Sequence, residues 1–198
     1  LYGMTTSEMD AAPLHHVQAL QGGGQLVRLT NQRDGIEVFR EQATVLLDAQ
    51  WKATAIGGYL GSTKPAQATA KSAAVSRLDA RGALATALQA FGFTAQVAQQ
   101  LQVAPQASTQ KTGAYQHFAL PQGVAGDAGA TLSIPARVKP VWFRLPEGLV
   151  SAFYVEVQGT ENSEHFAYAY VVAADDARLL LRHSLTSHAA DFKYRVWA

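Results

Sequence analysis

Residues 136–183 constrain the fold of this chain more than any other stretch, because they predict a series of β-strands joined by short turns. The stretch is rich in Val, Phe and Tyr and is interrupted by Pro-Glu-Gly at 146–148, by polar residues at 159–163 and by two aspartates at 175–176. Period-two alternation, β-branched or aromatic residues and polar turns are the signs of strands. Such short turns favour an antiparallel meander, whose apolar face must be covered by another layer.

The strongest helix signal lies upstream, at residues 79–91, and predicts the covering layer. Leu84, Leu88 and Phe91 are spaced to form one apolar stripe, and the residues at both ends are types that favour helix caps. A shorter helix is expected at 95–101. Helices followed by about five antiparallel strands predict an α+β fold of the helix-on-sheet, cystatin-like kind.

The N-terminal part predicts a second, smaller antiparallel β unit. A short helix is expected to run through Leu14, Val17 and Leu20 and to end at the triple glycine 22–24. Turn residues follow, with an Asp-Gly hairpin signal at 34–35. Short strands are expected at residues 25–30, 36–39, 44–47 and 53–60.

Composition places a domain boundary between these two parts. Residues 61–76 consist largely of Gly, Ser, Thr, Lys, Pro, Gln and Ala, which have little to bury and are typical of a linker. We therefore expect a β domain at 1–64, a linker at 65–76 and a helix-plus-sheet domain at 77–185. Residues 186–198 form a junction whose last part, D-F-K-Y-R-V-W-A, alternates as a strand. An apolar strand at this place predicts that the parent chain continues, and a natural C-terminal edge strand is the alternative.

Charge and composition argue against several function classes. The 198 residues include 16 basic and 15 acidic side chains without a dense basic run, so no electrostatic footprint for nucleic acid or an anionic membrane is present. The absence of cysteine excludes disulfides, thiolate metal sites and a cysteine nucleophile. No apolar run has the length of a membrane span. The chain begins with Leu1 rather than Met, so a signal peptide could have been removed.

Catalytic signatures are mostly absent from the sequence. It contains no H-E-x-x-H, no G-x-S-x-G and no P-loop. The adjacent histidines 15–16 cannot easily share one ligand direction, and those at 117, 165 and 183 favour ordinary polar positions in strands or turns. A turn and a strand face explain the acidic pairs 175–176 and 37/41. The aromatic residues between 142 and 170 favour core packing over a ligand cleft.

Three stretches, in the right order, resemble the pro-regions of fungalysin-type secreted zinc metallopeptidases. Residues 31–60 resemble the fungalysin/thermolysin propeptide domain, where G-I-x-V-F, V-L-L-D and G-Y-L follow one another; here these letters lie at 35–39, 45–48 and 58–60. Residues 136–157 resemble the part that carries L-V-P-A-Y-Y-V-E, from which Ser151 and Phe153 depart. Residues 179–198 are similar to the junction between pro-region and mature protease.

The resemblance implies a non-catalytic pro-region that assists folding of its own catalytic domain and inhibits it until it is cleaved. Domain 1–64 would correspond to the fungalysin/thermolysin propeptide domain and domain 77–185 to a PepSY-like module. The protein would be secreted or periplasmic. Its partner would be the catalytic domain, which would carry the zinc, and no nucleic acid, membrane, metal or cofactor is expected for this fragment itself.

The resemblance also implies an inhibitory and cleavable segment, which we expect in the polar stretch after Leu185, between two predicted strands. Within it, His188 could approach the zinc of the partner, since a catalytic zinc keeps an open coordination position. The segment consists of Thr186, Ser187, His188, Ala189, Ala190 and Asp191.

A different class of function stays open beside this interpretation. The chain could be a free-standing exported module that binds a peptide or small ligand in a cleft between sheet and helix. An enzyme in its own right is disfavoured, because no set of nucleophile, base and orienting residue is visible.

Overall fold

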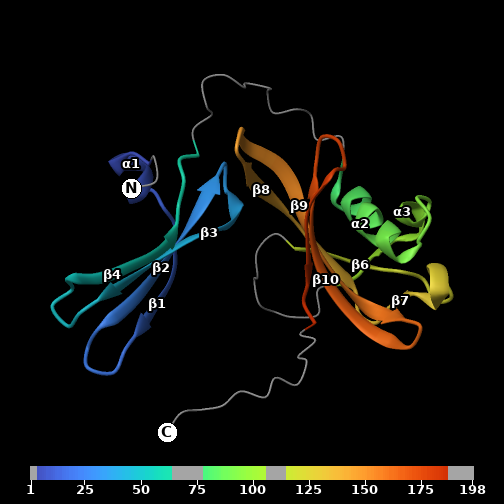
Figure 1. The fold of residues 1–198 in the computed structure, drawn as a ribbon, viewed down its shortest axis with the longest axis horizontal. Coiled ribbons are helices and arrows are strands. Elements are labelled where there is room, and N and C mark those ends of the chain that lie inside the picture. The colour runs from blue at the N-terminus through green and yellow to red at the C-terminus, as the bar shows by residue number, and fades with distance from the viewer. Residues whose placement is uncertain (1–3, 64–77, 106–114, 187–198) are drawn as a thin grey trace, which may run out of the picture. The chain divides into compact units, whose positions relative to one another are not determined.

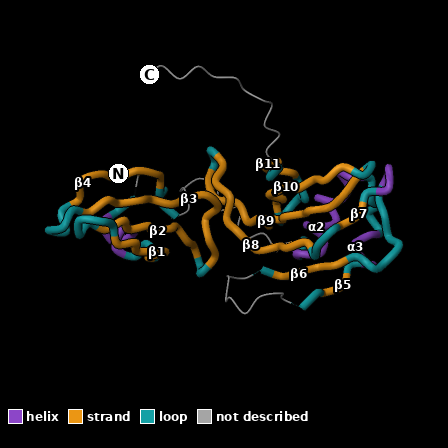
Figure 2. The backbone as a smooth tube through the Cα atoms, turned by 90° about the horizontal axis from the view of Figure 1, so that it is seen from below, coloured by secondary structure: helices purple, strands orange, loops and turns teal. Residues whose placement is uncertain are grey.

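Strands dominate the structure, a computed structural model that describes residues 4–63, 78–105 and 115–186 (Figure 1). Of these residues 51% are in strands and 15% in helices. Figure 2 shows the same imbalance, with long strand segments and only short helical ones. None of the described helices is both long and apolar enough to cross a membrane.

The described strands belong to an 11-stranded sheet with the order β1-β2-β3-β8-β9-β10-β11, in which β4 pairs with β3, β5 with β6, β6 with β8 and β7 with β9. The strands are β1 Leu14–Ala19, β2 Gln25–Arg33, β3 Ile36–Leu47, β4 Ala53–Tyr59, β5 Gln102–Val103, β6 Gln116–Ala119, β7 Thr131–Leu132, β8 Ala136–Leu145, β9 Gly148–Glu161, β10 Glu164–Ala173 and β11 Leu179–Ser184. The helices are α1 Thr6–Asp10, α2 Ala80–Leu88, η1 Gln89–Phe91, α3 Val97–Gln100 and η2 Asp127–Gly129.

The chain divides into two compact units. Unit 1 contains the described residues of Leu1–Arg77 together with Pro140–Phe153 and Ala173–Asp176. Unit 2 contains those of Leu78–Lys139, Tyr154–Val172 and Ala177–Ala198. Strands β8 and β9 therefore contribute residues to both units. The expected linker, residues 65–76, lies outside the described residues.

Unit 1 is built on the antiparallel strands β1 to β4. The Asp-Gly hairpin signal is confirmed, since Asp34 (φ 53°) and Gly35 (φ 76°) both adopt the left-handed conformation between β2 and β3. The short strands expected at 36–39 and 44–47 are one strand, β3, with an irregularity between them. Gly58 (φ 94°) is required in β4, because a Cβ there would lie 2.2 Å from the carbonyl oxygen of Gln42.

The short helix expected through Leu14 and Val17 is wrong. These residues form β1, which pairs with β2, and the helix of this region is α1, earlier in the chain. Thr5 caps α1 in a capping box with Glu8. Apolar residues three apart fit a helix. In the structure the segment instead pairs with β2, where the β-branched Val17 lies opposite Val27 and the backbone groups form sheet hydrogen bonds.

Unit 2 places helices on its strands, and the expected helix at 79–91 is confirmed as α2 followed by η1. The side chain of Asp79 caps α2 by accepting a hydrogen bond from the Gly82 amide at 2.7 Å. The expected stripe is buried, with Leu84 and Leu88 0% exposed. The Phe91 ring stacks on Phe166 of β10 with a centroid distance of 4.1 Å, which joins the helical layer to the sheet. Figure 1 shows α2 and α3 together beside the strands of this unit.

The predicted fold class, a small antiparallel β unit followed by a cystatin-like helix-on-antiparallel-sheet (PepSY-like) module, is wrong. The described chain is mostly β, and its 11-stranded sheet is mixed, because β3 pairs in parallel with β8 through Val38 and Trp142. Hydrophobic periodicity identifies strands but not their pairing partners. The sequence pattern therefore does not predict the bridge between Val38 and Trp142, which are far apart in the chain.

Leu84→Ala should lower the free energy of unfolding by about 3 kcal/mol, because it removes a fully buried side chain and leaves a cavity. Leu179→Ala is the matched control, since Leu179 is 46% exposed and its truncation should cost less than about 1 kcal/mol. Urea unfolding of the two variants measures the difference. Equal costs would contradict the placement of α2 over a packed core.

Candidate functional site

One face of the β1–β4 sheet in unit 1 carries an apolar row that crosses four strands. The register places Val17, Val27, Val45 and Ile56 directly opposite one another from β1 to β4. Residues opposite each other in a sheet project from the same face. Val17 is 41% exposed and Ile56 is 61% exposed, so the row is open to solvent at both edges.

A second row widens this apolar surface. Leu14 lies opposite Leu29, which is two residues along β2 from Val27 and therefore on the same face. Leu14 is 61% exposed. The surface formed by Leu14, Val17, Val27, Leu29, Val45 and Ile56 is called the apolar β1–β4 face below.

The opposite face of the same strands is mixed. One of its rows consists of His16, Arg28, Thr44 and Gly57, and the next consists of Gln18, Leu26, Leu46 and Ala55. An apolar sheet face is normally buried under another layer. In the described part of unit 1 the helical structure is limited to the five residues of α1, which bury no side chain. The apolar face is therefore a candidate surface for docking another protein.

The turn between β3 and β4 adds an exposed aromatic residue beside the edge strand β4. Asp48 holds this turn, since its carboxylate accepts hydrogen bonds from the amides of Gln50 and Lys52, both at 2.9 Å. Trp51 adopts φ 63° there and is 67% exposed. Tryptophan is enriched among the residues that dominate binding energy in protein interfaces.

Strand β3 also carries a buried carboxylate that holds unit 1 together. Glu41 is 5% exposed and forms a two-point salt bridge with the Arg144 guanidinium of β8, in which Nη2 lies 3.2 Å from Oε2. Oε2 also accepts hydrogen bonds from the Asn31 amide at 2.6 Å and from the Gly61 backbone N–H at 3.0 Å.

The surrounding donors are used as well. The Asn31 amide donates to the Gly61 carbonyl at 2.7 Å, and Arg144 Nη2 donates to the Ser62 carbonyl at 3.0 Å. The hydrogen bond with Glu41 raises the pKa of Arg144, and this effect outweighs burial, which lowers it. Asn31, Gly61 and Arg144 each make a further contact, so the network joins several segments of the backbone at one point.

An irregularity in β3 turns Glu41 into this interior. Between Thr30↔Gln42 and Gln32↔Glu37 the register shifts, so Asn31 alone faces several residues of β3. Arg40 lies in this bulge with φ 59°. A bulge reverses the side-chain alternation of a strand, which is why Glu41 is buried although its position predicts an ordinary strand face. The sequence carries no signal of this bulge.

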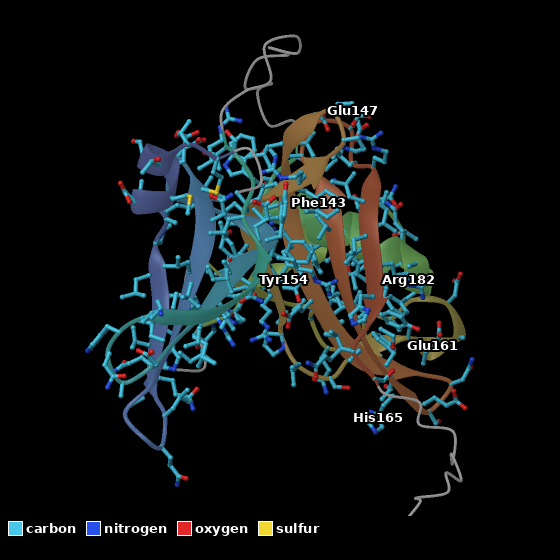
Figure 3. The ribbon with its side chains drawn as sticks, turned by 60° about the vertical axis from the view of Figure 1, so that its left-hand side comes forward. Phe143, Glu147, Tyr154, Glu161, His165 and Arg182 are labelled. Carbon is cyan, nitrogen blue, oxygen red and sulfur yellow. The ribbon has the colours of Figure 1, made fainter. Side chains whose placement is uncertain are left out.

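The parallel bridge between β3 and β8 is stabilised by aromatic contacts next to the network. Trp142 Nε1 donates to the carbonyl of Arg33 at 3.0 Å, and the Arg33 guanidinium lies 4.5 Å from the Trp142 ring centroid. Phe143, labelled in Figure 3, stacks with Phe39 at 6.0 Å. Trp142 therefore contacts Arg33 of β2 and Phe143 packs against Phe39 of β3, and both side chains are half-buried.

The expected inhibitory segment is described only at its first residue. The Thr186 hydroxyl lies 2.9 Å from Ser184 Oγ at the end of β11. Ser187, His188, Ala189, Ala190 and Asp191 lie outside the described residues. Within the described part of the chain, no group of three or more histidine or acidic side chains could hold a metal ion. His15 and His16 are exposed on β1.

Comparison with known proteins gives no assignment. No protein-family model matches the chain, and no curated protein sequence matches it.

Arg144→Met should lower the free energy of unfolding by about 3 kcal/mol, because it leaves the Glu41 carboxylate buried without its cation. Adding Glu41→Gln should recover at least about 1 kcal/mol, since the uncompensated charge is gone. Urea unfolding of the two single variants and the double variant measures this coupling. Lys52→Met, which removes an exposed cation from the β3–β4 turn, is the control and should be near neutral. Simple additivity of the two substitutions would contradict the network.

Proposed function

We propose that this chain is the pro-region of a secreted zinc metallopeptidase, and that it docks onto the catalytic domain of its own precursor through the apolar β1–β4 face. The observation that carries the docking is the apolar row from Val17 to Ile56, which crosses four strands, is exposed at both ends and has no covering helical layer among the described residues of unit 1. The kind of partner comes from the resemblance of residues 31–60 and 136–157 to fungalysin-type pro-regions.

The edge of the same sheet supports docking to a protein rather than to a small molecule. Strand β4 pairs with β3 and is exposed along its whole length. Its sequence, A-T-A-I-G-G-Y, has none of the lysine or proline residues that commonly protect edge strands. An unprotected edge can extend its ladder into a partner strand while the adjacent face buries apolar area.

In this proposal one interface accounts for both assistance in folding and inhibition. A surface that binds the folded catalytic domain and not its unfolded chain stabilises the folded form by mass action. The segment from Thr186 to Asp191 is then delivered to the cleft of that domain and blocks it until it is cut. The catalytic groups and the zinc belong to the partner, and this chain supplies binding and orientation.

Val17→Lys should weaken inhibition of the catalytic domain by about tenfold or more, because it places a charge in the apolar row that the interface would desolvate. Gln18→Lys is the matched control, since Gln18 is also exposed and occupies the next position of β1 but projects from the opposite face. Residual peptide hydrolysis, titrated with each purified chain, measures the inhibition constant. Full activity at micromolar concentrations of the unchanged chain would refute inhibition and leave a free-standing binding module as the better interpretation.

Deletion of all residues after Leu185 should reduce inhibition while leaving docking in place, and His188→Ala should reproduce part of the loss. His183→Ala, a substitution of an exposed histidine in β11, is the control and should inhibit like the unchanged chain. Binding to the catalytic domain is measured by calorimetry beside the hydrolysis assay. If the truncated chain inhibits equally well, docking alone carries the inhibition and the segment has no role in it.

A further inference from the structure

Unit 2 contains a pocket of about 330 Å³ that the docking proposal does not use. This volume lies at the lower end of the range for small-molecule pockets, about 300–1,000 Å³, so it suits one terminal group of a ligand. The pocket is lined by Pro105, His117, Ile134, Pro135, Arg137, Glu156 and Gln158. Three of these residues give it an apolar wall, and the others are polar or charged.

The charged side of the pocket is fixed by an ion pair between neighbouring strands. Glu156 of β9 is 8% exposed, and its Oε2 accepts from Arg137 Nε at 2.6 Å and lies 2.5 Å from Nη2. The pKa of Arg137 is raised: burial opposes the charge, but the hydrogen bond and the charge of Glu156 outweigh it. The pKa of Tyr154 is raised by burial and then by its hydrogen bond with Glu156. The carboxylate is thus occupied on both sides.

Arg137 still has donors to offer. Its side chain is 50% exposed although the carboxylate partner is buried, and within the described part of the chain Nη1 has no hydrogen-bond partner. His117 lies directly opposite Arg137 across the β6–β8 ladder and lines the same pocket. A planar guanidinium with an open edge matches the two oxygens of a carboxylate.

A second cation, Lys139, shares an aromatic neighbour with Arg137. Lys139 Nζ lies 5.1 Å from the Tyr115 ring centroid, and the Arg137 guanidinium lies 5.4 Å from the same centroid. Lys139 also lies 5.7 Å from the ring of Tyr154, which Figure 3 labels on β9.

From this combination we infer that the pocket binds an apolar amino-acid residue through its free α-carboxylate. The carboxylate would meet the open edge of Arg137, with His117 and Gln158 as further hydrogen-bonding groups, and the side chain would pack on Ile134 and the two prolines. Ile134 is 50% exposed without a ligand, which leaves apolar surface for this contact. Such a residue is available at the C terminus of a peptide or as a single acylated amino acid.

The experiment uses the full chain, labelled with ¹⁵N, and the probe acetyl-Ala-Ala-Leu with a free C terminus. We expect amide shifts at residues 116–118, 134–138 and 156–158, and an affinity at least about tenfold higher than for the same tripeptide with a C-terminal amide. N-acetyl-leucine distinguishes the two sources: binding as tight as the tripeptide indicates a single residue, and weaker binding indicates a peptide end. Equal affinity for the acid and the amide, or no shift at these residues, would overturn the inference.

Substitutions test which residues bind the carboxylate, and they are combined so that no buried charge is left without its partner. Arg137→Met combined with Glu156→Gln removes both charges and should weaken the acid probe about tenfold or more, with little change for the amide. Arg137→Lys keeps the charge but loses the planar edge and should fall in between. Arg182→Met is the control, because Arg182, labelled in Figure 3 on β11, is an exposed cation of the same unit outside the pocket. A loss of the same size in Arg182→Met would show a general charge effect and refute the site.

Discussion

The buried carboxylate of Glu41 is the constraint on which the assembly of unit 1 depends. A carboxylate that is 5% exposed must be neutralised and given hydrogen bonds, and its partners come from β2, from the backbone after β4 and from β8. Segments that are distant in sequence, at residues 31, 61 and 144, are therefore held at one point. The bridge between Val38 and Trp142 lies beside this point. The charge network thus determines which strands come together. An apolar contact would determine this less strictly, because it accepts many partners.

The two units solve the problem of burying a sheet face in different ways. Unit 2 covers its strands with α2 and η1, and the fully buried side chains of Leu84 and Leu88 show the result. Unit 1 leaves Val17 and Ile56 exposed on an apolar row. Its order comes from strand pairing, from the hairpin turns and from the Glu41 network. This exposed apolar surface needs an explanation, because a sheet face that no second layer covers buries little apolar area and gains little stability from it.

Sequence reasoning identified local structure well and long-range structure poorly. The caps and the apolar stripe predict α2, and Asp34-Gly35 predicts the β2–β3 hairpin, because these signals act within a few residues. The cystatin-like fold class failed because it required the partner of β3, which lies in β8. The role of Glu41 was missed because it depends on the left-handed backbone of Arg40, a position that no glycine or asparagine marks.

The exposed face and the proposed role in folding follow from one physical property. A unit that buries little apolar area of its own has little stability to spare, and local stability rises where contacts are added. A partner that supplies the missing layer would therefore order unit 1 while unit 1 orders the partner, because linkage between binding and folding is reciprocal. In the proposed role, the exposure of this face in the isolated chain is the expected cost of a surface that a partner would complete. The Glu41 network suits this role, since it keeps the strands in register before the partner binds.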